Sequence, residues 1–159
     1  MDLRAHLLTN LDRAYDGRSW HGPNLKRALR GLTPAVAFFR PGPERHSAYD
    51  LALHAAYWKY VVRRRLSGDK RGSFALPGSN FFPAPPRPSA VELDAARSLL
   101  EREHRALHEL VEELPERVFT ARFGRWTGEA VISGVAAHDL YHAGQIQLVR
   151  KLFANRRKP

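Results

Sequence analysis

The chain has 159 residues with a net charge of +10, and its 43% hydrophobic and 26% charged residues are typical of one globular domain spanning residues 1–159. It has no cysteine, which excludes disulfides, thiolate metal sites and a cysteine nucleophile and leaves imidazole, carboxylate and water as metal ligands. No apolar run is long enough to cross a bilayer and no signal-peptide core is present, so we expect a cytoplasmic protein with no membrane partner.

The first third of the chain predicts one amphipathic helix followed by short helical pieces. Residues 2–16 place leucines on one face, and Asp16 with the following glycine ends this helix. Pro23 fits the first position of a short helix that runs to residue 31. Thr33 and Pro34 fit the N-cap and first position of another short helix.

Three long helices follow, separated by a proline-rich connection. Ser47, with an acidic residue three positions later, opens a helix that ends at about residue 66. Residues 68–88 hold five of the eleven prolines, and we expect aromatic side chains to hold this connection against the core. Ser89 opens a helix ending at Pro115, and a last helix spans about 128–154.

Outside these helices, the sequence predicts little regular structure. Residues 117–123 weakly favour a strand. The pattern predicts an all-α protein, a four-helix bundle with a long crossover between helices 2 and 3. A basic tail follows at about 155–159.

Three histidines interrupt the apolar faces of these helices. His138 and His142 are four residues apart on the core-facing stripe of the last helix, and His54 lies on that of the second long helix. A buried neutral imidazole needs partners for one donor and one acceptor, and a shared metal ion would satisfy all three rings. His104 and His108 are also four residues apart, but charged neighbours predict a solvated flank for them.

Four further residues are candidates for the surroundings of this site. Trp58 lies one turn from the first histidine, and its indole N–H needs an acceptor. Gln145 lies where a leucine would pack better, so we expect it to hydrogen-bond near the metal. Asp139 lies off the core stripe and would orient a histidine of another helix or stay on the surface. His21, beside a tryptophan in the first loop, would cover the mouth of the site.

Three segments, LALHAAYWKYVVRRRL, AAHDLYHAGQIQLVRKL and the Trp-His-Gly-x-Asn-Leu motif from residue 20, resemble the DinB-like superfamily of small bacterial metal-binding proteins. The resemblance implies an up-down-down-up bundle, a homodimer, and a divalent metal bound by His54, His138 and His142. Members include transferases and isomerases that use low-molecular-weight thiols, and many members have no assigned activity.

We therefore expect a metal-dependent transferase or hydrolase-like enzyme that acts on a small molecule. Because the chain has no thiol, a thiolate would come from a low-molecular-weight cosubstrate. Zn²⁺ is the first choice of metal, and Ni²⁺, Mn²⁺ and Fe²⁺ stay open because imidazole binds all of them. No catalytic base is identified. The alternatives are a metal-binding protein without turnover, or a nucleic-acid-binding or regulatory protein that uses its basic surface. We do not expect nucleic acid, because the chain has no recognisable binding motif.

Overall fold

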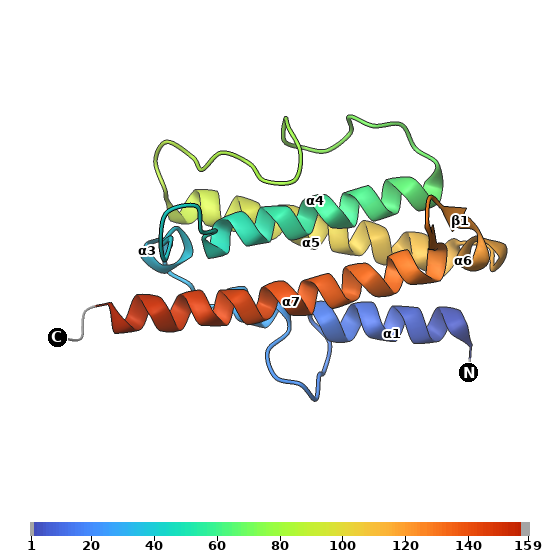
Figure 1. Cartoon of the computed structure of the whole chain (residues 1–159), viewed down its shortest axis with the longest axis horizontal. Coiled ribbons are helices and arrows are strands. Elements are labelled where there is room, and N and C mark those ends of the chain that lie inside the picture. Colours follow the sequence, from blue (N-terminus) through green and yellow to red (C-terminus); the bar gives the residue numbers. More distant parts are fainter. Residues whose placement is uncertain (1, 157–159) are drawn as a thin grey trace.

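The computed structural model describes residues 2–156 and is predominantly helical (Figure 1). The long helices are α1 (Leu3–Tyr15), α4 (Ala48–Ser67), α5 (Ala90–Glu113) and α7 (Gly128–Asn155). The short helices are α2 (Leu25–Leu29), α3 (Pro34–Ala37) and α6 (Arg117–Thr120). The all-α prediction is confirmed for this part of the chain. Residues 157–159 of the predicted basic tail lie outside the described residues.

Side-chain caps explain where the long helices begin. The hydroxyl of Ser47 accepts a hydrogen bond from the backbone N–H of Asp50, whose carboxylate accepts one from the backbone N–H of Ser47 at 2.7 Å. The hydroxyl of Ser89 caps α5 by accepting from the N–H of Glu92 at 3.2 Å. Gly68 caps the C-terminal end of α4, and its left-handed φ of 80° favours glycine. These boundaries agree with the sequence-based prediction.

The predicted start of the short helix at Pro23 is wrong by two residues. The N-cap is Asn24, whose side-chain oxygen accepts from the N–H of Arg27 at 3.1 Å, and α2 begins at the next residue. The Asn24 amide also donates to the carbonyl of Gly17 at 2.9 Å. This buried asparagine therefore fixes the helix start, and the proline lies outside the helix.

The weak strand predicted at 117–123 is only partly correct. Residues 117–120 form α6, because Phe119 turns inward and is 2% exposed. The strand β1 (Arg122–Phe123) follows and pairs antiparallel with β2 (Trp126–Thr127), with Gly124 at a positive φ of 71° in the turn. This hairpin leads directly into α7.

The four long helices lie side by side along the molecule (Figure 1). Helix α4 packs against α5 and α7, and α1 packs against α7 and α5. Alanines on the buried face of α4 let its neighbours approach closely, and leucines from α1 and α5 fill the rest of the interior. Each buried leucine contributes about 1.5–3 kcal/mol. Among residues 2–156, no helix is both long and apolar enough to cross a membrane.

The proline-rich connection at residues 68–88 arches over α4 before α5 begins (Figure 1). Phe82 is buried in the core, and Phe74, Leu76 and Phe81 pack against it, which confirms that apolar side chains hold the connection in place. Asn80 has a positive φ of 65°, a conformation that asparagine tolerates better than most residues. The connection is therefore fixed next to the middle of α4.

Candidate metal centre

The three predicted histidines converge between α4 and α7. His54 comes from α4, and His138 and His142 come from successive turns of α7. The Nε2 atom of His138 lies 3.1 Å from that of His54 and 2.9 Å from that of His142. Each residue offers a ligand atom, and these three atoms all lie within 4.8 Å of one another. The packing of two helices has thus brought together residues that are 84 positions apart in sequence.

Hydrogen bonds at Nδ1 of His54 and His142 determine which ring nitrogen of each histidine carries the free lone pair. His54 Nδ1 lies 3.0 Å from the backbone oxygen of Asn80, and His142 Nδ1 lies 2.6 Å from the side-chain oxygen of Gln145. Both oxygens are acceptors, so each Nδ1 carries the proton and donates it. The Nε2 atoms of His54 and His142 therefore direct lone pairs toward the centre of the cluster, as metal-ligating histidines do.

His138 cannot satisfy this cluster by hydrogen bonding alone. Its Nδ1 atom is buried and has no hydrogen-bond partner among residues 2–156. Its Nε2 atom faces two lone pairs although it can donate to only one of them. A cation at the meeting point would accept all three lone pairs. Tetrahedral Zn²⁺ with Zn–N bonds of about 2.0–2.1 Å requires nitrogen atoms roughly 3.3 Å apart, slightly farther than the distances found here. The residues therefore fit a divalent metal.

Burial keeps all three rings in the neutral form that binds metals. It lowers the pKa of His138 to about 3, with the neighbouring rings of His142 and His54 adding to the effect. It lowers the pKa of His142 to about 4, although the hydrogen bond to Gln145 opposes that change. The pKa of His54 is lowered for the same reason, against the opposing hydrogen bond to Asn80. Neutral imidazole is the form that a metal requires.

Residues of the connection cover one side of the centre. The indole Nε1 of Trp58 donates to the side-chain oxygen of Asn80 at 3.1 Å. Asn80 is thus the acceptor that the indole N–H was expected to need. Phe81 stacks on His54 with ring centroids 4.2 Å apart, and it also stacks on His46 at 3.7 Å. His138 is partly exposed, whereas His54 and His142 are buried.

Asp139 neither lies on the surface nor contacts a histidine of the centre, which were the two expected positions. It is fully buried, so a surface position is wrong, and its carboxylate bonds to Lys59 rather than to a histidine of the centre. The Nζ atom of Lys59 also lies 3.3 Å from Nδ1 of His104. Burial raises the pKa of Asp139, and the charge of Lys59 opposes that rise. The sequence signal was available, because Lys59 lies three and four residues from apolar Val62 and Ala55 on the core face of α4.

The solvated flank predicted for His104 and His108 is wrong for His104. His104 is 7% exposed and stacks on Tyr15 of α1 with ring centroids 4.0 Å apart, because α1 packs over this face of α5. Burial lowers the pKa of His104 to about 2. His104 also lies near Asp12 and Asp16, in a second group that could hold a metal ion. Because Nδ1 of His104 accepts a hydrogen bond from Lys59, the ring proton lies on Nε2, and no lone pair is left for a metal. His108 is partly buried, with Nε2 3.1 Å from Asp12.

His21 lies on the exposed loop between α1 and α2. His21 is exposed, and the neighbouring Trp20 is 100% exposed. Within one chain, neither residue covers the mouth of the site as was expected of His21. Asn80 is the contact that sequence reasoning missed, because a backbone carbonyl on a long loop leaves no pattern in the sequence.

Comparisons with known proteins agree with the fold. The crystal structure of a conserved protein from Enterococcus faecalis superposes with a TM-score of 0.71, over 98% of this chain and 99% of that one, at 16% sequence identity. This likeness concerns the fold alone. No curated protein matches the chain. The family model of the DinB superfamily matches residues 19–146, which include all three histidines of the centre. The chain therefore belongs to the DinB superfamily.

Proposed function

We propose that this chain is a divalent-metal-dependent enzyme, a transferase or hydrolase-like enzyme that acts on a small molecule with a low-molecular-weight thiol as cosubstrate. The observation that carries the proposal is the convergence of three neutral Nε2 atoms, from His54, His138 and His142, that cannot satisfy one another by hydrogen bonds. Membership of the DinB superfamily supports a metal at this position.

The donor set suits a catalytic rather than a structural metal. Catalytic zinc sites have three protein ligands and an open position, whereas structural zinc sites are closed by four. A divalent ion held there would act as a Lewis acid and lower the pKa of a water or thiol that reaches the open position. Zn²⁺ is the first choice, with Ni²⁺, Mn²⁺ or Fe²⁺ as alternatives.

The residues around the centre have positioning roles in this proposal. Asn80 and Gln145 hold the outer nitrogens of two histidines and so keep both rings aimed inward. Trp58 holds Asn80 in place through its indole N–H. The partly exposed side of His138 is where a small molecule would enter. Because the chain has no cysteine, the thiol comes from the cosubstrate.

The proposal is tested with protein loaded with Co²⁺ in place of the native metal. Adding a low-molecular-weight thiol should change the visible absorption of the loaded wild-type protein, because sulfur would replace a weaker ligand on the ion. The His138→Ala variant serves as the control and should show no such change. An unchanged wild-type spectrum at saturating thiol would refute the thiol as cosubstrate.

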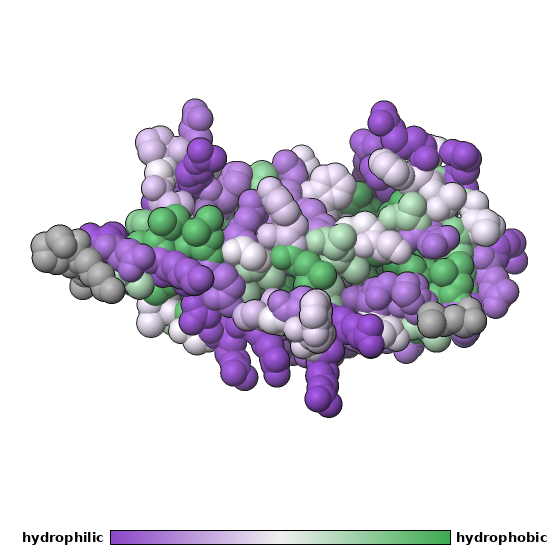
Figure 2. Space-filling view, turned by 60° about the horizontal axis from the view of Figure 1, so that its bottom comes forward, coloured by the Kyte–Doolittle hydropathy of each residue, from purple (hydrophilic) through white to green (hydrophobic). Residues whose placement is uncertain are grey.

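We also propose a cytoplasmic homodimer of up-down-down-up four-helix bundles. One face of α7 exposes small and apolar residues at a spacing of three or four positions, which suits packing against the same helix of a second copy. These residues are Ala137, Tyr141, Gly144, Leu148 and Leu152. Figure 2 shows apolar patches among the hydrophilic side chains along the molecule. Sedimentation should show a dimer for the wild type and a monomer for Leu148→Glu.

A further inference from the structure

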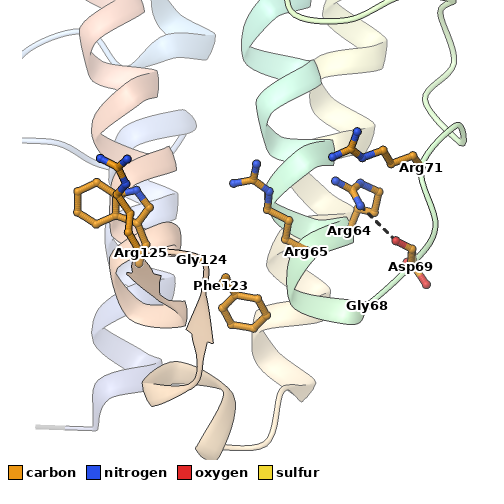
Figure 3. A pocket seen from close by; sticks show the side chains of 9 residues that line it. Arg64, Arg65, Gly68, Asp69, Arg71, Phe123, Gly124 and Arg125 are labelled. Carbon is orange, nitrogen blue, oxygen red and sulfur yellow. Dashed lines mark hydrogen bonds between the residues drawn. The ribbon is translucent and has the colours of Figure 1, made fainter.

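Two neighbouring cavities outside the histidine centre share three arginines. One cavity of about 610 Å³ lies between the end of α4 and the β1–β2 hairpin (Figure 3). Another of about 760 Å³ lies between α4 and the connection at residues 68–88. Arg64, Arg65 and Arg71 line both, and Arg125 lines the first. We call the two cavities together the arginine groove.

The positive charge of the arginine groove is only partly balanced within the described part of the chain, because its four arginines face a single lining carboxylate, that of Asp69. Within residues 2–156, none of the four arginines forms an ion pair with a carboxylate. The guanidinium group of Arg64 donates to the backbone oxygen of Asp69 at 3.3 Å. In the view of Figure 3 the guanidinium group of Arg65 lies between those of Arg125 and Arg64. Guanidinium groups stay charged at any physiological pH, so an anion is the partner that this groove lacks.

Hydrogen bonds hold the loop side of the groove in place. The backbone N–H groups of Gly72 and Ser73 each donate to the hydroxyl oxygen of Tyr60 at 3.2 Å. Gly72 has a positive φ of 101°, which favours glycine at this turn. Tyr60 is buried and lines the larger cavity. These bonds fix the backbone directly after Arg71, so the groove has a defined wall.

The arginine groove extends to the wall of the metal centre. Trp58 and Asn80 line the larger cavity, and both also border the histidines. The indole of Trp58 lies 6.3 Å from the ring of His54 between centroids. Along α4, the residues at 54, 58 and 65 share one face, and 11 residues of helix span roughly 16 Å. The larger cavity therefore ends at Trp58 and Asn80, the two residues that border the metal centre.

We propose that the arginine groove binds the carboxylate or phosphate group of an elongated anionic small molecule, whose other end reaches the three-histidine centre. The planar, multidentate guanidinium group matches the geometry of both anions. The cavity volumes lie within the range of roughly 300–1,000 Å³ that small-molecule sites occupy. The assignment of this molecule as the substrate rests on the proposed function, whereas anion binding itself requires no metal.

A nucleic acid is the competing anionic partner, and the geometry favours a small molecule. Single-stranded nucleic acid binds to extended basic grooves with aromatic side chains on which successive bases stack. Here the arginines surround two cavities at one end of α4, and the larger cavity continues toward the histidines. A compact site of this kind holds one charged group and leaves the remainder of the ligand directed along α4.

The test uses Zn²⁺-loaded protein titrated with inorganic phosphate and, separately, with succinate at constant ionic strength. Amide chemical shifts in NMR spectra locate the binding and give its affinity. We expect saturable shifts at residues 64–72 and 123–126, and a weakening of about tenfold or more for Arg65→Gln and for Arg71→Gln. The exposed Arg102→Gln on α5 is the control with the same charge change, and it should bind as the wild type does. The tighter of the two probes identifies the anionic group.

Further variants separate this proposal from the proposed function. His54→Ala should lose the metal and still bind both anions at the groove. A wild type that shows no saturable shifts, or an Arg102→Gln variant that weakens binding as much as Arg65→Gln, would overturn the anion site. A single-stranded oligonucleotide that displaces both probes, with affinity falling steeply with salt, would instead make the groove a nucleic-acid site.

Discussion

The buried pair Lys59–Asp139 makes a strong prediction about stability. Both side chains are 0% exposed, and the lysine also contacts the neutral ring of His104. Lys59→Met keeps most of the side-chain volume but leaves the carboxylate buried without its counter-charge. Breaking a buried ion pair in this way costs about 3–5 kcal/mol. That is a large share of the roughly 5–15 kcal/mol that holds a domain folded.

Urea unfolding monitored by circular dichroism measures this cost, with all proteins in the same metal state. Asp139→Leu should cost a similar amount, because it leaves the ammonium group of Lys59 unpaired. The double variant Lys59→Met with Asp139→Leu should lose much less than the two single variants together, because no charge stays buried. Lys26→Met is the matched control, and it should cost less than about 1 kcal/mol because its partners Asp16 and Glu101 are half-exposed.

Two results would refute this reasoning. Single variants at Lys59 and Asp139 that each cost no more than the Lys26 control would show that the pair contributes little. A double variant whose cost equals the sum of the single costs would show that the two charges are not energetically coupled.

Three further predictions concern pH, metal affinity and helix capping. The folded chain excludes a proton from His104 (pKa about 2) that the unfolded chain accepts below about pH 6.5, so stability should fall with pH below that point. In urea unfolding, the free energy of unfolding of His104→Gln should fall less steeply below pH 6.5 than that of the wild type, by up to about 1.4 kcal/mol per pH unit. An equal pH dependence in the two proteins would contradict this prediction. Gln145→Ala removes the acceptor for Nδ1 of His142 and should weaken metal binding by about 10–100-fold in a chelator competition, whereas Gln147→Ala should not. Ser47→Ala removes the α4 cap and should cost about 1–2 kcal/mol in urea unfolding, and a loss near zero would show that the cap is dispensable.

The helices and the histidine centre were predictable because their signals are local. The capping residues Ser47 and Ser89 define the starts of α4 and α5, and the apolar spacing of three and four residues defines their core faces. The same spacing assigns His54, His138 and His142 to core-facing positions. Their convergence needed only that α4 and α7 be neighbours, which is common in a small helical bundle.

The parts that were missed depend on packing between more than two elements. Asp139 was expected to orient a histidine or to stay on the surface, but the joint packing of α4, α5 and α7 buries it with Lys59 beside His104. His104 itself is covered by Tyr15, from a helix whose position along α5 the sequence does not reveal. Asn80 contacts the centre through a backbone oxygen on a long connection, where neither helix nor strand periodicity applies.

Elemental analysis of untagged protein purified without chelator tests the metal centre most directly. Wild type should contain about one divalent metal ion per chain, and so should His108→Ala, whose ring lies outside the centre. His54→Ala and His138→Ala should contain none. A wild type that carries no metal and takes up none on reconstitution, or an equal loss in His108→Ala, would contradict a metal bound by His54, His138 and His142.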